Sequence, residues 1–491
     1  MKLKRLIKDL PLKVVFGSPL ISITGISSDS RLVAPGNLFI ARRGTGSHGG
    51  KFIDDVVRSG AAAILTDLPD PSLTGVTQLY HPYPEQIEAE LSAAYHDYIS
   101  SQMVLVGITG TNGKTTCAYL MKFLLDRLGK KAGLIGTVEW LVGDRVYPSL
   151  NTTPDIHTAY RLLREMKEVG CSAAVMEVSS HGLSQGRTKT LDFDIAIFTN
   201  LSQDHLDYHG NMEAYGLAKS LFFKNLGDNG GKAGKASKVA IINNDDPKAD
   251  LMASVCREKV MRYGLEKGAE LFADELLFTE SGVSFTAHYL GKSFPFNLPL
   301  IGRFNVSNAL AVIGAGLALG ESLGRIAAIM RDFPGVNGRL ERVENEQGKS
   351  IYVDYAHTPD ALEKTLKSLR EFCTGKLWLV FGCGGDRDRD KRAKMGRVAG
   401  KYADFTFVTS DNPRGEDPKA IGNEIITGFE GSNYTLILDR ADAIRTAVQA
   451  AAPGDHLLIA GKGHERIQTF ARTSLPFDDR LIVKEVVATQ S

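Results

Sequence analysis

The segment 107–116, which reads GITGTNGKTT, has the composition of a loop that holds phosphate groups. Its glycines let backbone N–H groups turn toward phosphate oxygens, and Lys114 can offer a cation to the β- and γ-phosphates of a nucleotide. Thr115 can offer a hydroxyl to Mg²⁺. Ile108 stands where the general P-loop pattern has its first glycine, so a glycine-rich turn that happens to carry a lysine is the alternative.

Three further side chains have types that suit a phosphate site. Glu177 ends a predicted buried strand, where a carboxylate is costly unless it is paired or bound to a metal ion. The alternative is a helix cap at the strand end, with Ser179 and Ser180 as the caps. His205 follows another predicted strand, although a lone histidine is more often structural than a ligand. Lys219 falls in a helical pattern, and from its residues alone a solvated helix lysine is the simpler interpretation.

A second group of residues suits recognition of a small zwitterion. Pro413 fixes the backbone of the segment 411–414 (DNPR), and Arg414 can make a bidentate contact with a carboxylate. Arg387 follows a glycine turn directly. It also begins the charge run 386–392 (DRDRDKR), and a surface charge run is the alternative, especially for Arg389 and Arg392.

Regular elements must position these groups. Short apolar runs at 103–108, 173–178, 195–199 and 239–243 predict buried parallel strands, and helical patterns lie between the early ones, as at 118–128 and 158–169. Further strand-like runs occur at 351–354, 377–381, 405–409 and 456–460. We predict an α/β fold with three domains. They are a small N-terminal α/β domain (1–102), a central P-loop-type domain with a parallel sheet (103–335) and a C-terminal Rossmann-like domain (336–491). The segment 331–338, rich in Gly, Pro and Asn, is the predicted hinge.

Composition excludes several classes of protein. The net charge is +1, from 58 basic and 57 acidic residues, so no global field recruits nucleic acid or an anionic membrane. The five cysteines are widely spaced and match no zinc or redox motif. The N-terminus does not make a secretory signal, and no apolar run reaches the roughly 18–20 residues that span a bilayer. We expect a cytoplasmic monomer that neither inserts into membranes nor binds nucleic acid.

Seven more blocks follow the loop along the chain. They are EVSSHGL (177–183), FTNLSQDHLDYHG (198–210), GRFNVSN (302–308), DYAHTPDAL (354–362), GCGGDR (382–387), DNPR (411–414) and GKGHE (461–465). Together with TGTNGKTT they resemble the Mur ligase family, and in particular its branch that adds the third residue to the peptidoglycan precursor. The resemblance covers essentially the whole chain.

The resemblance implies an ATP-dependent, Mg²⁺-requiring ligase that makes an acyl phosphate, which an amine then attacks. Lys114, His205 and Lys219 would be catalytic. The ATP site would comprise Gly110, Thr111, Asn112, Gly113, Lys114, Thr115, Thr116, Asn305 and Arg339, with Asn308 beside Asn305. The metal ligands would be Thr115, Glu177, His205 and Lys219, the last as a carbamate formed with CO₂. Because that reaction needs the neutral amine, a lowered pKa of Lys219 would favour it.

The resemblance also implies two further substrates, UDP-MurNAc-L-Ala-D-Glu and meso-diaminopimelate. The first would be held by Ser28, Ser30, Thr45, Gly46, Ser47, Thr152, Thr153, Ser179, Gln185 and Arg187. Ordinary turn chemistry would explain any one of the N-terminal residues equally. Diaminopimelate would be held by Arg387, Asp411, Asn412, Pro413, Arg414, Gly461 and Glu465. Lysine lacks the second carboxylate of diaminopimelate and would leave Arg414 unpaired, which would reject it.

Other functions remain open at this point. A lysine-adding relative is opposed by Arg414, and an enzyme like folylpolyglutamate synthetase is opposed by the N-terminal SDSR segment (28–31) and the C-terminal blocks. A P-loop switch or motor would hydrolyse nucleotide without an amine acceptor, and it gives no reason for DNPR or GKGHE. A pure binding module would not need Lys114 and Thr115.

Overall fold

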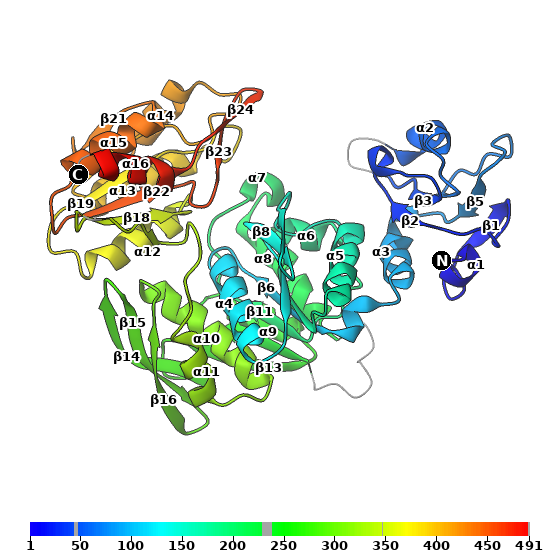
Figure 1. The fold of residues 1–491 in the computed structure, drawn as a ribbon, viewed down its shortest axis with the longest axis horizontal. Helices are drawn as coiled ribbons and strands as arrows, with labels where there is room; N and C mark the ends of the chain where they lie inside the picture. Colours follow the sequence, from blue (N-terminus) through cyan, green and yellow to red (C-terminus); the bar gives the residue numbers. More distant parts are fainter. Residues whose placement is uncertain (44–47, 228–237, 346, 490–491) are drawn as a thin grey trace. The chain divides into compact units, whose positions relative to one another are not determined.

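The computed structural model describes residues 1–43, 48–227, 238–345 and 347–489. The chain divides into two compact units. The first comprises residues 1–107, 130–194 and 225–238, and the second comprises residues 108–129, 195–224 and 239–491. Helices and strands alternate through both units, which confirms the α/β class (Figure 1).

The first unit begins with a five-stranded sheet of order β1-β5-β4-β3-β2, in which only β1 runs antiparallel to its neighbour. Its strands are β1 (Lys13–Phe16), β2 (Gly25–Ser27), β3 (Asn37–Ile40), β4 (Ala63–Thr66) and β5 (Thr77–Tyr80). Helices α1 (Leu3–Leu6), α2 (Ile53–Arg58) and α3 (Pro84–Tyr95) accompany it. Leu91 of α3 and Leu38 of β3 belong to one buried apolar cluster, so this sheet has a core of its own.

The largest sheet has eleven strands in the order β16-β15-β14-β13-β12-β11-β6-β10-β7-β8-β9. The strands are β6 (Val104–Thr109), β7 (Ala132–Ile135), β8 (Glu139–Val142), β9 (Arg145–Pro148), β10 (Ala173–Glu177), β11 (Ile195–Phe198), β12 (Val239–Asn243), β13 (Lys259–Gly264), β14 (Leu271–Thr279), β15 (Gly282–Tyr289) and β16 (Lys292–Leu298). The four strands predicted from apolar runs are all present.

The predicted parallel pairing is present, as in β10 with β7 and β11 with β12, but antiparallel strands that were not predicted extend the sheet at both ends. Strands β7, β8 and β9 pair antiparallel, as do β14, β15 and β16. The sequence hides most of these outer strands because they are half exposed, although β7 is buried along its whole length. In β14, for example, buried residues occur only near the start and the rest alternate between partly buried and exposed, so no continuous apolar run forms.

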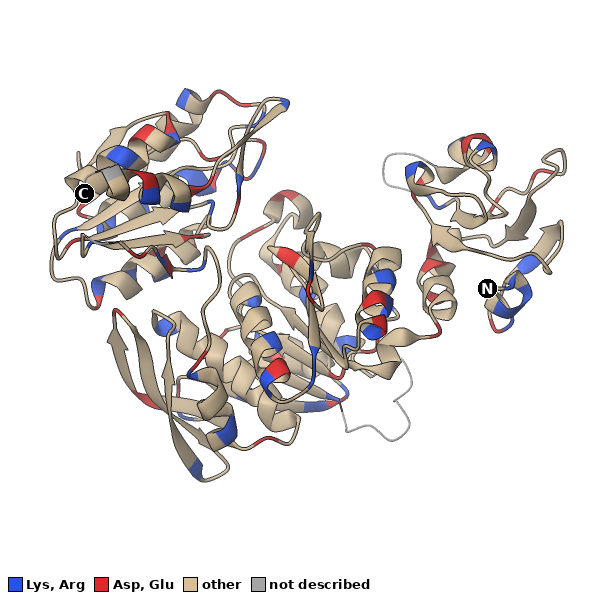
Figure 2. Cartoon of the chain, viewed as in Figure 1, with Lys and Arg blue, Asp and Glu red and all other residues tan. Residues whose placement is uncertain are grey.

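Helices accompany this sheet in both units. They are α4 (Lys114–Arg127), α5 (Ile156–Glu168), α6 (Ser180–Ser184), α7 (Leu206–His209), α8 (Met212–Lys224), α9 (Ala249–Val255), α10 (Arg303–Ala318) and α11 (Leu323–Met330). Figure 2 places charges of both signs on helices and loops, while the buried strands β6, β7, β11 and β12 of the sheet carry none. Among the residues described, no helix is both long and apolar enough to cross a membrane.

The C-terminal sheet has the order β17-β18-β22-β19-β20-β21, and β17 is its only antiparallel strand. The strands are β17 (Glu341–Arg342), β18 (Ser350–Asp354), β19 (Leu377–Phe381), β20 (Phe405–Val408), β21 (Tyr434–Leu436) and β22 (His456–Ala460), and β23 (Ile467–Phe470) and β24 (Thr473–Pro476) form a separate hairpin. The helices are α12 (Pro359–Arg370), α13 (Lys391–Tyr402), α14 (Pro418–Ile426), α15 (Arg440–Ala450) and α16 (Asp479–Thr489).

Two separate apolar clusters form on this parallel sheet. One includes Leu366 of α12 and Ile425 of α14, and the other includes Ile444 of α15 and Val483 of α16. Helices therefore cover both faces, as predicted for a Rossmann-like domain. In such sheets the loops after the carboxyl ends of the strands bind ligands. DNPR follows β20 and GKGHE follows β22, so both blocks lie at that edge.

Candidate active site

The predicted phosphate loop is clamped to the segment that follows β11. Backbone N–H groups of Thr111 and Asn112 donate to the main-chain and side-chain oxygens of Asn200, at 2.8 and 2.9 Å. The Thr199 hydroxyl donates to the Asn112 carbonyl at 2.6 Å. A Cβ at Gly110, where φ is +146°, would lie 1.9 Å from that hydroxyl oxygen. Gly110 is thus required both by its backbone conformation and by the clamp.

Two lysines meet at this loop. Lys114 donates to the carbonyls of Gly110 and Thr111, at 2.9 and 2.8 Å. Lys219 of α8 donates to the same Gly110 carbonyl at 2.8 Å and is 1% exposed. Burial, reinforced by the charge of Lys114, lowers the pKa of Lys219 well below its usual value. The structure therefore contradicts the simpler interpretation of Lys219 as a solvated helix lysine.

His205 and Asp204 lie in the segment between β11 and α7. His205 has a positive φ of 54°, and its Nε2 lies 3.4 Å from Oδ2 of Asp204. Burial raises the pKa of Asp204, but the charges of His205, Lys391 and Lys114 outweigh that effect and keep it lowered. Asp204 therefore stays an anion in the surroundings of the phosphate loop. The sequence prediction gave His205 a direct role and treated this carboxylate only as a neighbour of His205.

Arg339 contacts the loop from the predicted hinge side. Its Nη2 donates to the Thr115 hydroxyl at 3.0 Å, and its guanidinium carbon lies 4.4 Å from the centroid of the Tyr355 ring. Asn308 lies on the other side, where its Oδ1 would be 2.2 Å from a Cβ at Gly113. Asn305 donates to the Ile301 carbonyl and accepts from Asn308. Asn308 thus packs against the loop, and Asn305 holds Asn308 in place.

In the first unit, Glu177 is fully buried and bound to Thr137 at both oxygens. The Thr137 backbone N–H donates to Oε1, and its hydroxyl donates to Oε2, each at 2.9 Å. The Thr137 hydroxyl also contacts that of Thr152 at 3.0 Å. A Cβ at Gly136 would lie 2.5 Å from Oε1. Thr137 was missed by sequence reasoning, although a Gly-Thr pair directly after the apolar strand β7 was a usable signal.

The other residues predicted to hold the muramoyl-peptide end lie next to Glu177. The Thr153 hydroxyl donates to the Glu177 carbonyl, and Arg187 donates to the carbonyl of Thr153 at 2.7 Å and to Oε1 of Gln185. Ser179 caps α6 by accepting from the Gly182 N–H, so the capping alternative is correct for Ser179. Ser180 lies inside the helix and is not the cap.

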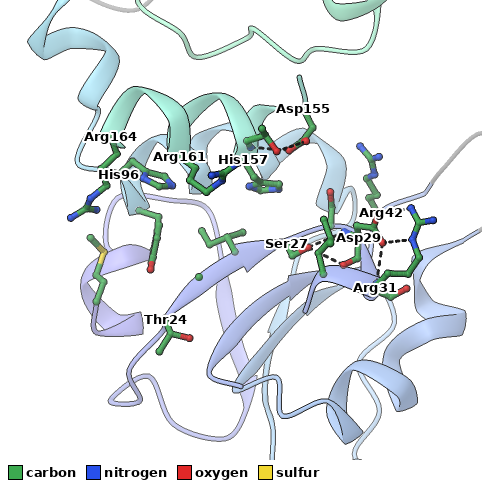
Figure 3. Close-up of a pocket in the computed structure, with 18 of the residues that line it drawn as sticks. Thr24, Ser27, Asp29, Arg31, Arg42, His96, Asp155, His157, Arg161 and Arg164 are labelled. Carbon is green, nitrogen blue, oxygen red and sulfur yellow. Dashed lines mark hydrogen bonds and ion pairs between the residues drawn. The ribbon is translucent and has the colours of Figure 1, made fainter. Parts of the chain in front are cut away.

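Ser28 and Ser30 line a cavity of about 1360 Å³ in the first unit (Figure 3). More basic than acidic side chains line it, and Arg42 and His157 are labelled in the close-up. His157 contacts Glu88 at 3.0 Å. Burial raises the pKa of Glu88, but the hydrogen bond and charge of His157, with lesser contributions from Arg42 and Ser28, lower it to about 2. Sequence reasoning missed His157 and Glu88. The predicted residues Thr45, Gly46 and Ser47 lie outside the described residues.

At the C-terminal sheet, DNPR and GKGHE are joined by side-chain hydrogen bonds. Asn412 donates to Oε2 of Glu465 at 2.8 Å. A Cβ at Gly461, where φ is +111°, would lie 2.7 Å from Oδ2 of Asp411. Arg414 has a positive φ of 52° and donates to the Gly385 carbonyl at 2.7 Å. Of the predicted diaminopimelate residues, the structure thus brings Asp411, Asn412, Gly461 and Glu465 together, and Arg414 turns toward the glycine turn.

The charge run 386–392 is not uniformly on the surface. Arg387 is exposed and donates to the carbonyl of its neighbour Asp386, as a surface charge run predicts. Arg392, however, is completely buried and binds the carboxylates of Glu416 and Glu424, each at 2.8 Å. The surface interpretation of Arg392 was therefore wrong. The helical position of Arg392 in α13 turns it inward, under the loop that carries Arg414.

The oxygen donors among the predicted metal ligands suit a Mg²⁺ ion that also binds water or phosphate oxygens. In the described ranges no group of three or more His, Cys, Asp or Glu side chains could by itself hold a metal ion. Mg²⁺ is typically bound through one or two carboxylates together with phosphates and water. The buried Glu177 carboxylate and the Thr115 hydroxyl are oxygen donors of that kind.

Three family models match the chain. The model described as "Mur ligase family, catalytic domain" matches residues 22–96, "Mur ligase middle domain" matches 108–316, and "Mur ligase, glutamate ligase domain" matches 338–463.

Relatives match along nearly the full length. UDP-N-acetylmuramoyl-L-alanyl-D-glutamate--2,6-diaminopimelate ligase of Caldanaerobacter subterraneus subsp. tengcongensis is 40% identical and covers 96% of each chain. The enzyme of that name from Syntrophomonas wolfei subsp. wolfei is 42% identical and covers 99% of each. A solved structure with the same name is 32% identical, with a TM-score of 0.71, and covers 100% of this chain and 99% of its own.

Replacing Gly113 by alanine should abolish measurable ATP binding, because the added Cβ would collide with Asn308 and force the loop open. Gly129→Ala is the matched control: its φ of +78° is equally unfavourable for alanine, yet nothing lies within 4 Å of the added atom. The control should lose roughly 1 kcal/mol of stability and keep its ATP affinity. Isothermal titration of both variants with ATP and Mg²⁺ tests this. Equal affinity in the two would contradict the steric role of Asn308.

Proposed function

The chain belongs to the Mur ligase family, and from this premise we propose that it joins meso-diaminopimelate to UDP-MurNAc-L-Ala-D-Glu at the expense of ATP. The observation that carries the proposal is the pair of lysines on the Gly110 carbonyl, one at a phosphate loop and one buried with a lowered pKa. The names of the full-length relatives support the choice of substrates.

The reaction runs through an acyl phosphate. An oxygen of the D-glutamyl carboxylate attacks the γ-phosphorus of ATP, the bond to the β,γ-bridging oxygen breaks, and ADP leaves. The diaminopimelate amine then attacks the carbonyl carbon, and the tetrahedral intermediate expels phosphate while the amine loses a proton. Lys114 offsets the negative charge that develops on the transferred phosphoryl group. Asn200 and Thr199 hold the loop in place, and its other backbone N–H groups would bind the phosphates.

Mg²⁺ would be held by the Thr115 hydroxyl, the Glu177 carboxylate, His205 and the modified Lys219. When bound, it neutralises phosphate charge and polarises the transferred group. Thr137 supports this assignment because its two hydrogen bonds fix the orientation of the buried Glu177 carboxylate.

Lys219 is the residue proposed to become a carbamate. Its neutral amine attacks the carbon of CO₂, an N–C bond forms, an electron pair moves to oxygen, and the nitrogen loses one proton. An ammonium becomes an anion, which can ligate a cation where the ammonium would repel it. Burial supports this assignment because it disfavours the protonated amine.

The site at the C-terminal sheet is proposed to hold diaminopimelate, with Arg414 on its distal carboxylate and Glu465 on its distal ammonium. Lysine, the substrate of a lysine-adding relative, has no distal carboxylate that could pair with Arg414. We also propose that the protein acts in the cytoplasm, since all five cysteines lie within the described residues and none forms a disulfide.

An acceptor screen tests the proposed function. Phosphate release should require ATP, UDP-MurNAc-L-Ala-D-Glu and meso-diaminopimelate together. Replacing diaminopimelate with lysine should lower kcat/KM by roughly 100-fold or more, because Arg414 loses its carboxylate partner. A coupled phosphate assay with mass spectrometry of the product measures both. Phosphate release from ATP alone at the same rate would identify a P-loop hydrolase, and equal use of lysine would identify the lysine-adding branch.

Arg414→Ala should raise the KM for diaminopimelate roughly tenfold or more, since a charge-assisted contact is lost, while the affinity for ATP stays the same. Arg389→Ala serves as the control, because Arg389 is an exposed member of the nearby charge run that pairs with Glu424. Steady-state kinetics with varied diaminopimelate give the comparison. An unchanged KM in the Arg414 variant would remove it from the acceptor site.

Lys219→Ala should lower kcat by roughly 100-fold or more, and added formate should restore part of the activity by supplying the missing anion. Lys224→Ala on the same helix is the control, since Lys224 is exposed and should be dispensable. Removal of bicarbonate and CO₂ should slow the wild type and leave the formate-rescued variant unaffected. Wild-type activity in Lys219→Ala would refute the carbamate.

A further inference from the structure

Lys462, the second residue of GKGHE, has a completely buried side chain at the edge of the proposed acceptor site. Its Nζ donates to Oδ1 of Asn412 at 3.1 Å and to Oε2 of Glu465 at 3.0 Å. A buried ammonium is costly unless polar partners surround it, so these two contacts account for its position. They also join the loop after β20 to the loop after β22.

The contacts of Lys462 fix the orientation of the Asn412 amide. Oδ1 accepts from Lys462 and from the Thr469 backbone N–H at 3.0 Å, while Nδ2 donates to Glu465. A flipped amide would point its NH₂ group at two donors that cannot accept. Asn412 therefore has one allowed orientation.

The same contacts fix Glu465. Both of its hydrogen bonds, from Asn412 and Lys462, end on Oε2. In the described part of the chain no hydrogen bond ends on Oε1, and the side chain is 28% exposed. Glu465 is thus held at one oxygen and can present the other to a ligand ammonium.

We propose that Lys462 is a positioning residue for acceptor selection: it holds Asn412 and Glu465 so that Oε1 of Glu465 meets the distal ammonium of the amino acid. Lys462 itself is too deeply buried to touch the substrate. The proposal rests on the proposed function, because it assigns Glu465 to diaminopimelate. Lys462 should therefore affect the KM only of amino acids that carry a second ammonium.

The backbone of the two loops is held separately from Lys462. Arg440 forms a bidentate pair with Asp479, both completely buried, and donates to the Ala460 carbonyl at 3.0 Å. Gln468 donates to the Asp411 carbonyl at 2.9 Å. Loss of the Lys462 ammonium should therefore release the side chains of Asn412 and Glu465 while the loops stay in place.

The test compares diaminopimelate with 2-aminopimelate, which has both carboxylates and lacks the second amino group. Lys462→Met should raise the KM for diaminopimelate roughly tenfold and leave the KM for 2-aminopimelate and for ATP within twofold. Glu465→Gln should have the same selective effect, and the two changes should not add in the double variant, because Lys462 acts through Glu465. Lys349→Met is the control, since Lys349 precedes β18 and donates to the Val448 carbonyl of α15, away from the loops that carry Asn412 and Glu465.

A merely structural role would alter both acceptors alike, and equal effects, additive effects or an unchanged KM would each overturn the proposal. If Lys462→Met does not fold, Lys462→Gln keeps an uncharged donor and should show the same selectivity with a smaller effect.

A crystal structure of whichever variant folds tests the role of Lys462 without any substrate. Glu465 should have left Asn412 in that structure, and an unchanged contact of 2.8 Å between Nδ2 and Oε2 would contradict the role of Lys462. Wild type that does not use diaminopimelate would refute the proposed function, while the crystal structure would still report on Lys462.

Discussion

Two ammonium-bearing side chains converge on one carbonyl oxygen, that of Gly110. Two ammonium groups that donate to the same oxygen lie close together, and their positive charges repel strongly where little water screens them. Lys114 lies at the start of α4 and is partly exposed, whereas burial lowers the pKa of Lys219. The fold therefore gives two residues of the same type different surroundings. In the proposed function, Lys114 offsets phosphate charge and the neutral amine of Lys219 reacts with CO₂.

The clamp on the loop sets this geometry. Thr199 and Asn200 fix the loop from the end of β11, and α8 brings Lys219 to the carbonyl from the same stretch of chain. Thr115 completes the arrangement, but its hydroxyl accepts from Arg339. Arg339, which directly follows the predicted hinge, is thus joined to the phosphate loop through one oxygen atom.

The sequence allowed the elements and motifs of the site to be predicted, because buried parallel strands leave continuous apolar runs and the loops after them carry the chemistry. Contacts between residues far apart in the chain produce no comparable pattern in the sequence. Thr137 binds Glu177 across 40 positions of sequence, and no periodicity connects them. Arg392 ends a run of charged residues, as a surface residue would, yet the position of α13 buries it against Glu416 and Glu424. The half-exposed strands β14 to β16 were missed for the related reason that burial on one face produces no apolar run.

In the proposed acceptor site, a residue of the DNPR motif makes most of its hydrogen bonds to the protein and leaves few for a ligand. Asn412 was predicted to touch the amino acid, but its carbonyl oxygen is occupied by Lys462 and Thr469, and its amide group is occupied by Glu465. Few of its hydrogen-bonding positions are left for a substrate. Glu465 and Arg414 are partly exposed and carry opposite charges, which suit the ammonium and carboxylate at the distal end of diaminopimelate. Asn412 and Lys462 hold Glu465 in position, so in the proposed function acceptor selection depends on a residue that the substrate does not reach.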